Sequence, residues 1–270
     1  MKLFMNKCIF LVVPFLFFGC SSLNTPNSLE QITFNIINNN TSKEISFNEF
    51  IDEILKYDIV LIGEEHNNHK HILVETKIIE ALNSKKDVEV VLEMMSVDKQ
   101  IKIDNAKING YENKNLLKEI DWSDSWDKSY YKRLVLFIFN SKIDLVAGNL
   151  SKSEIQTIFN GAYPLQGKAS TTFQVKEKIK DMIIDTSHKI DDTKTIDKFV
   201  QIQQYKDRRM ADKLVSSNKT AILIAGKYHT RKDIGIPLHI EDFNKSKTFI
   251  SIGLQTNIKN EYVDYSFKIK

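Results

Sequence analysis

The chain has 270 residues and a formal net charge of +3 at pH 7. This charge is too small to indicate a nucleic-acid-binding surface, and no segment clusters lysine and arginine with aromatic residues on one face. We therefore expect no nucleic-acid partner. About 250 residues remain after the N-terminal segment described next, which suits one domain of moderate size or two small ones.

The first residues have the pattern of an export signal. A short start with two lysines precedes an apolar stretch over residues 9–18. A run this short is typical of a signal-peptide core rather than a membrane span. The sequence Phe-Phe-Gly-Cys at 17–20 resembles a bacterial lipobox, whose cysteine is lipidated after cleavage. We therefore expect a lipoprotein signal peptide at 1–19 and a lipid on Cys20, with an ordinary signal peptide as the alternative.

Residues 20–30 are rich in Ser, Asn, Thr and Pro and predict a flexible tether, followed by a single domain over 31–270. The second cysteine, Cys8, leaves with the signal, so the mature domain would have neither a disulfide nor a cysteine-ligated metal. Ser21 after the lipidated cysteine fits sorting to the outer membrane by analogy with other bacterial lipoproteins. The expected location is the bacterial cell envelope, with a lipid anchor in the outer membrane.

The domain begins with a predicted hairpin, in which the β-rich runs ITFNII and EISF flank an Asn-rich turn. FNEFIDEILKY follows as a short amphipathic helix and DIVLIG as a buried strand. Residues 69–86 have apolar residues at helical spacing, and DVEVVLEMM is a second buried strand. This strand–helix–strand succession predicts a parallel sheet with helices on its faces.

The rest of the chain continues the same pattern. Residues 97–140 are predicted to be helical, and KIDLVAGNL is a third strand. Residues 151–218 are mainly helical and polar, and TAILIAGKYH is a fourth strand. TFISIGLQT and EYVDYSFKIK form a β-rich end. No linker divides the domain.

The first and fourth predicted strands run into the same motif, Gly-x-x-His. Gly63 precedes His66 in IVLIGEEH, and Gly226 precedes His229 in AILIAGKYH. Glu93 follows the second strand at an equivalent place. Ligands of parallel α/β sheets bind beyond the carboxyl ends of the strands, and glycine lets a ligand approach the backbone there. We expect these side chains to face one rim, the alternative being that they cap helices and satisfy turns.

A predicted helix at 199–214 carries the second candidate feature. Tyr205, Arg208 and Arg209 stand at i, i+3 and i+4, a spacing that lets their side chains meet. The chain has only four arginines, so two adjacent ones suggest a need for a planar, permanently charged group. A guanidinium favours the phenolate form of a neighbouring tyrosine. Phenolate is a known axial ligand of haem iron and arginine suits haem propionates, although an ordinary surface helix explains the same residues.

Taken together, these features resemble the ChaN family of haem-binding lipoproteins in the Tiki-like superfamily. The resemblance extends over nearly the whole mature chain. It is carried by the lipobox, the N-terminal hairpin, VLIGEEH, a strand ending in Leu-Glu-Met, Trp122 and Trp126, AGNL, the helix motif of Gln203, Asp207, Met210 and Ala211, and AGKYH.

The resemblance implies an α/β fold with a central, mostly parallel mixed sheet flanked by helices. It also implies an additional helical subdomain, here roughly 97–140 and 151–218. It implies that a tyrosine binds haem iron and that two haems stack between the subunits of a homodimer. The matching tyrosine is Tyr205, with Tyr228 as the competitor.

The other expected haem-pocket residues are Arg208, Arg209, His66, His229 and Tyr228. We expect the Tyr205 hydroxyl and the two imidazoles to converge on one cavity.

The expected function is haem and iron acquisition or storage by a binding or transport protein rather than an enzyme, with an outer-membrane haem receptor as a possible partner. The alternative is a metal-dependent peptidase or esterase, because relatives in the superfamily use the corresponding rim positions. Those positions here are Glu64, Glu65, His66, Glu93 and His229. Against this alternative, no His-Glu-x-x-His helix is present.

Overall fold

A computed structural model describes residues 32–186, 192–243, 246–254 and 259–270. The predicted signal peptide, the tether and Cys20 lie outside this part of the chain. Residues 32–270 form one compact unit. None of the helices in the described ranges has the length and apolar character that crossing a membrane requires.

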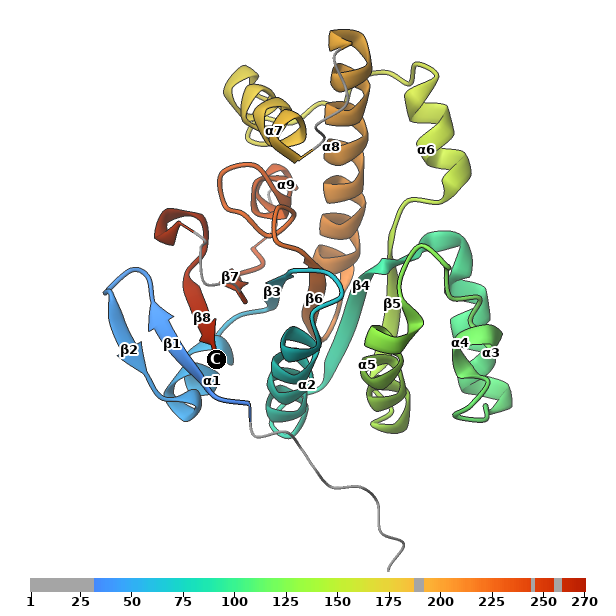
Figure 1. The fold of residues 1–270 in the computed structure, drawn as a ribbon, viewed down its shortest axis with the longest axis vertical. Coiled ribbons are helices and arrows are strands. Elements are labelled where there is room, and N and C mark those ends of the chain that lie inside the picture. Colours follow the sequence, from blue (N-terminus) through green and yellow to red (C-terminus); the bar gives the residue numbers. More distant parts are fainter. Residues whose placement is uncertain (1–31, 187–191, 244–245, 255–258) are drawn as a thin grey trace, which may run out of the picture. The chain divides into compact units, whose positions relative to one another are not determined.

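The described residues contain one mixed sheet of eight strands in the order β2-β1-β8-β7-β3-β6-β4-β5 (Figure 1). The strands are β1 (Phe34–Asn38), β2 (Lys43–Ile45), β3 (Ile59–Glu64), β4 (Val88–Ser96), β5 (Asp144–Asn149), β6 (Thr220–Gly226), β7 (Phe249–Gly253) and β8 (Tyr265–Ile269). The block from β8 to β5 is parallel, whereas β1 pairs antiparallel with both β2 and β8. The predicted α/β fold with a mixed sheet is confirmed, as is the N-terminal hairpin.

The helices in the described ranges are α1 (Phe47–Ile54), α2 (His69–Asn83), α3 (Gln100–Asn109), α4 (Leu116–Glu119), α5 (Lys128–Asn140), α6 (Lys152–Phe159), α7 (Phe173–Thr186), α8 (Thr193–Ser216) and α9 (Ile236–Asp242), with short 3₁₀ turns η1 (Val97–Lys99) and η2 (Asn260–Tyr262). Local sequence fixes where two of them begin. Ser46 and Glu49 form a capping box at α1, and Ser151 and Glu154 form another at α6. In each, the serine hydroxyl accepts a hydrogen bond from the backbone N–H of the glutamate. The glutamate carboxylate in turn accepts one from the backbone N–H of the serine.

The sheet separates two apolar layers, because side chains of successive strand residues point to opposite faces. Every residue of β3 is buried, as expected for a parallel strand covered on both sides. Val60 and Ile62 pack in the same core as α2 and α5. Ile59 and Leu61 pack in the core that contains the C-terminal half of α8 and α9. The continuous apolar run of this strand is therefore explained by helices on both faces.

Beyond the carboxyl edge of the sheet stand α6, α7 and the N-terminal half of α8, which we call the helical extension (Figure 1). Two small apolar clusters hold it together, one between α7 and α8 and one between α6 and α8. Of the two helical segments expected in a subdomain, only 151–218 contributes to this extension, and the C-terminal half of α8 packs against the sheet. In the other segment, 97–140, α5 packs its apolar side against the sheet as part of the main core.

Candidate functional site

The two Gly-x-x-His turns lie side by side at the carboxyl edge of the sheet. Strands β3 and β6 pair in parallel with Glu64 opposite Gly226, so both chains leave the sheet at the same level. A Cβ at position 226 would lie 2.7 Å from Nε2 of His66, so a larger residue there would push the imidazole aside. The small residue thus lets the imidazole from the first turn lie directly over the backbone of the second.

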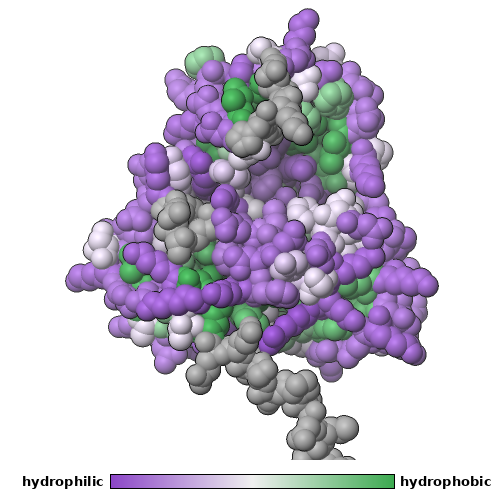
Figure 2. Space-filling view, viewed as in Figure 1, coloured by the Kyte–Doolittle hydropathy of each residue, from purple (hydrophilic) through white to green (hydrophobic). Residues whose placement is uncertain are grey.

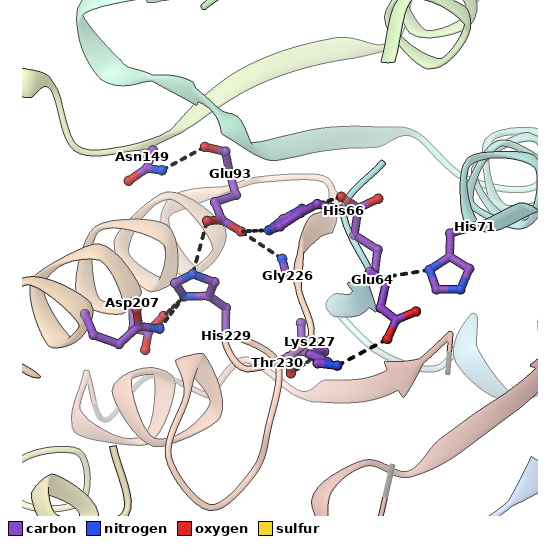
Figure 3. A network of polar contacts seen from close by, with 12 residues as sticks. Glu64, His66, His71, Glu93, Asn149, Asp207, Gly226, Lys227, His229 and Thr230 are labelled. Carbon is purple, nitrogen blue, oxygen red and sulfur yellow. Dashed lines mark hydrogen bonds and ion pairs between the residues drawn. The ribbon is translucent and has the colours of Figure 1, made fainter. Parts of the chain in front are cut away.

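The carboxylate of Glu93, from β4, lies between the two imidazoles (Figure 3). Its Oε1 is 3.1 Å from Nε2 of His229, its Oε2 is 3.7 Å from Nε2 of His66, and Oε2 also accepts the Gly226 N–H at 2.8 Å. The other ring nitrogen of His229, Nδ1, contacts Asp207 of α8. The predicted convergence of His66, Glu93 and His229 on one rim is therefore present in the structure.

The charges of this array stabilise one another in the protein interior. Burial opposes the imidazolium of His229, but the carboxylates of Glu93 and Asp207 outweigh it and raise its pKa to about 10. Burial likewise opposes the carboxylate of Glu93, but the charge and hydrogen bond of His229 hold its pKa below the ordinary value. The direction of this shift favours the imidazolium of His229 at neutral pH, whereas at Asp207 burial outweighs the charge of His229 and raises the pKa.

A second group of buried polar side chains lies behind His66. Nδ1 of His66 is 2.7 Å from Oε1 of Glu64, which also accepts the Tyr131 hydroxyl of α5 at 2.5 Å. Glu75 of α2 is fully buried, and its pKa is raised well above the ordinary value by burial and then by the charge of Glu64. Burial also comes first for His66, but the Glu64 hydrogen bond and the nearby carboxylates reverse its effect and raise the pKa.

Above this array is a cavity of about 430 Å³, which we call the rim pocket. It is lined by Glu64, Glu65, His66, Met182, Gln203, Gly226, Lys227, Tyr228 and His229. The ring of Trp126 lies beside that of His66, with 4.7 Å between the centroids. Most of the lining residues are polar or ionisable, but more of the exposed lining surface is apolar than polar.

Tyr205 does not reach the rim pocket, so the expected convergence of its hydroxyl with the two imidazoles is wrong. Successive residues of a helix are about 100° apart, so positions 203 and 207 both lie about 200° from 205 around the helix. Gln203 and Asp207 contact His229, whereas Tyr205 faces α6 and donates its hydroxyl to the Tyr163 carbonyl at 2.7 Å.

The ring of Tyr205 belongs to a partly exposed apolar surface between α6 and α8, which we call the α6–α8 face. Its partly buried members, Ile155, Phe159, Ala162, Phe199 and Tyr205, pack on the buried Leu150, Ile158 and Ile202. Figure 2 shows hydrophobic side chains gathered in this part of the helical extension. The neighbouring Tyr163 is 91% exposed.

The two arginines diverge rather than sharing a surface with Tyr205. Arg208 turns to α9, where it pairs with Asp242 at 2.7 Å and donates to Nδ1 of His239 at 3.0 Å. Arg209 turns to α6 and pairs with Glu154 at 2.6 Å. Both guanidinium groups therefore have carboxylate partners within the chain.

The remaining expected residues have separate positions. Tyr228 lines the rim pocket. Glu65 turns outward and pairs with Lys227 at 3.2 Å. In the residues that the structure describes, no group of three His, Cys, Asp or Glu side chains is arranged to hold a metal ion. The Glu and His side chains of the rim therefore pair with one another and do not form a ligand set.

Sequence reasoning missed Glu75 and Tyr131. Glu75 occupies the apolar stripe of α2, between Ile72 and Ile79, and a carboxylate on the core side of a helix is rare without a special reason. Its position in the apolar stripe could have marked Glu75 as a buried carboxyl group. No comparable signal marks Tyr131, because a buried tyrosine is common in helices of this type.

Comparisons with known proteins identify the family and agree with the fold. The family model described as haem-binding uptake, Tiki superfamily, ChaN matches residues 50–240. A solved structure described as "Cofacial heme binding to ChaN of Campylobacter jejuni" is 39% identical, with a TM-score of 0.84, over 89% of this chain and 98% of that chain.

A toxin effector domain from Vibrio vulnificus, RRSP, is 14% identical with a TM-score of 0.47, over 83% of this chain and 37% of that chain. The search of curated proteins gave no match. The family model covers most of the domain, and together with the ChaN structure it shows that this chain belongs to the ChaN family of the Tiki superfamily.

Proposed function

We propose that this protein binds ferric haem through a tyrosinate and serves haem or iron acquisition or storage. The observation that carries the proposal is the close similarity to a ChaN whose structure is described as binding haem cofacially, over nearly the whole of both chains. The proposal includes a homodimer that encloses two stacked haems. It also includes a lipid on Cys20 that anchors the protein to the outer membrane, where a haem receptor would be its partner.

The α6–α8 face is the surface best suited to a porphyrin. Haem has large apolar faces, and this surface offers the partly exposed rings of Phe159 and Phe199 beside the phenol of Tyr205. Phenolate is an established ligand of ferric haem iron. Tyr228, the competing tyrosine, lines the rim pocket beside Lys227 and His229.

Binding through Tyr205 requires a local rearrangement. The phenol now donates to the Tyr163 carbonyl, and a phenolate would face that carbonyl as a second acceptor. The segment around Tyr163 would therefore move away when the proton is lost. Tyr163 itself is the rival ligand, because it is highly exposed and adjacent to the same face.

Of the two arginines, Arg209 is the better partner for a haem propionate. It lies on the same side of α8 as Tyr205, and its ion pair with Glu154 is about one-third exposed, so a propionate could compete for the guanidinium. Arg208 is committed to Asp242, whose side chain is 2% exposed. Haem would supply a Lewis-acidic ferric iron, and this chain would supply the phenolate, the apolar face and the guanidinium.

A hemin titration of the purified protein tests the proposal. We expect a saturable tyrosinate-type visible spectrum that is lost in Tyr205→Phe and retained in Tyr163→Phe and Tyr228→Phe. Gel filtration should show a dimer only after hemin is added. Loss of the spectrum in Tyr163→Phe or Tyr228→Phe alone would move the ligand to that residue, and the absence of any saturable change would refute haem binding.

A further inference from the structure

One loop lies against the phenol oxygen of Tyr205. It connects α6 to α7 over residues 160–172, and we call it the strap. A single face of α8 holds the strap, because helix residues at i, i+3, i+4 and i+7 lie on the same side. Each member of this face donates a hydrogen bond to an oxygen of the strap. The members are Gln201, Gln204, Tyr205 and Arg208.

The second half of the strap, residues 167–172, is firmly anchored. Ser170 is fully buried, and its carbonyl oxygen accepts from the Gln204 amide at 3.0 Å. The carboxylate of Asp242, on α9, accepts the backbone N–H of Ala169 at 2.6 Å and that of Ser170 at 3.3 Å. Moving this half would break several buried hydrogen bonds at once, so we expect it to stay in place.

The first half of the strap, residues 161–166, has fewer attachments. The Ala162 carbonyl accepts from the Gln201 amide and the Tyr163 carbonyl accepts from the Tyr205 hydroxyl, both at 2.7 Å. A phenolate has no hydrogen to donate, so the second of these bonds is lost when Tyr205 ionises. The amide of Gln201 is then the main side-chain donor that holds this half against α8.

Space and backbone conformation both allow the first half to move. Tyr163 is 91% exposed, and a cavity of about 260 Å³ lies between Pro164 and side chains of α7 and α8. The bond from Arg208 to the Gln166 carbonyl is long, at 3.4 Å. Gly161 has a φ of +120°, which residues with a side chain rarely adopt, and a Cβ there would have no neighbour within 4 Å among the described residues. Gly161 is therefore placed to act as a hinge.

We propose that residues 161–166 form a gate over Tyr205 that opens when haem binds. Gly161 is its hinge, and the Gln201 amide is the latch that holds it closed. This inference rests on the proposed function, because it assigns Tyr205 to the haem iron. The gate controls uptake, since the Tyr163 carbonyl lies against the phenol oxygen while the gate is closed. The apparent affinity for haem is reduced in proportion to the fraction of molecules whose gate is open.

Stopped-flow mixing of the purified protein with hemin tests the latch. We expect Gln201→Ala to bind hemin about fivefold faster and about fivefold more tightly, the effect on an opening equilibrium of losing one neutral hydrogen bond. The control is Gln174→Ala, an exposed glutamine of α7, which should bind like the unaltered protein. Unchanged or slower binding by Gln201→Ala would overturn the proposal.

A pair of glycine variants tests the hinge without removing a hydrogen bond. Gly161→Ala should also bind hemin faster, because alanine disfavours the backbone conformation of the closed gate. Gly110→Ala is the matched control, since Gly110 has a φ of +81° and equally open surroundings but lies outside the strap. The same rate change in both variants would show a general effect of backbone strain and refute the hinge.

A measurement without hemin separates the gate from haem binding. Amide relaxation-dispersion NMR reports exchange between conformers on the microsecond-to-millisecond timescale. We expect exchange at Tyr163 and Leu165 that increases in Gln201→Ala, and none at Ala169 or Ser170. If the first half shows no more exchange in Gln201→Ala than in the unaltered protein, the gate is refuted even if hemin binds. The absence of a hemin spectrum in every variant would instead refute the proposed function, and with it the role of the gate in uptake.

Discussion

Replacing Glu75 by glutamine should make the stability of the protein less dependent on pH. Between the ordinary glutamate pKa of 4.5 and the raised pKa in the fold, the unfolded chain has lost the proton of Glu75 and the folded chain keeps it. The free energy of unfolding therefore falls as the pH rises, by about 1.4 kcal/mol for each pH unit. Glutamine has nearly the shape of the protonated acid, and its amide N–H replaces the acid O–H as a donor. It does not titrate.

The consequence can be expressed as a slope. The difference in unfolding free energy between Glu75→Gln and the unaltered protein should grow in favour of the variant as the pH rises above 4.5, with a limiting slope of about 1.4 kcal/mol for each pH unit. Urea unfolding followed by circular dichroism at three pH values measures it. Glu80→Gln is the matched control, because Glu80 is exposed on the same helix. If both variants give the same flat difference, Glu75 is ionised in the fold.

Three further predictions concern other parts of the molecule. Gly226→Ala should displace the imidazole of His66, because the new Cβ would lie 2.7 Å from its Nε2; an unchanged imidazole NMR signal would contradict this. Ser46→Ala should lower the free energy of unfolding by about 1 kcal/mol in urea through the lost helix cap, and a variant as stable as the parent would argue against the capping box. Asp207→Asn should lower the pKa of His229 from about 10, because burial then opposes the imidazolium with only Glu93 close by. The stability that the raised pKa of His229 contributes is present at pH 6.5 and disappears as the pH passes about 10, so the variant should lose more stability at pH 6.5 than above pH 10. NMR titration of His229 checks the pKa.

The sequence was most informative where chain-local patterns dominate. The apolar runs at β3 and β6 are long and end in glycine, and the structure places these strands side by side with their histidines over one edge. The hairpin of β1 and β2 follows from two β-rich runs around an Asn-rich turn. The position of β8 between β1 and β7 could not be read in this way, because it depends on pairing between residues more than 200 positions apart.

The candidate site was predictable only in part, for a geometric reason. Helical spacing correctly predicts that Tyr205 and Arg209 point the same way, but it cannot tell which neighbour each side of a helix meets. α8 contacts α6, α7, α9 and the sheet, so residues one or two positions apart enter different environments. Thus Asp207 reaches His229, while Tyr205 reaches the loop after α6. Glu75 was overlooked because its partner, Glu64, is on another element.

The strand β8 has a consequence for the order in which the chain can fold. It is formed by residues 265–269, which follow every other strand of the sheet in the chain, and it connects the N-terminal hairpin to the rest of the sheet. Without these residues, β1 can pair only with β2, and Ile36 lacks Phe267 as its cross-strand partner. An isolated two-stranded hairpin is at best marginally stable in water. The first strands of the domain therefore depend on its last strand, and deleting residues 265–269 would release the hairpin while leaving β7, β3, β6, β4 and β5 paired.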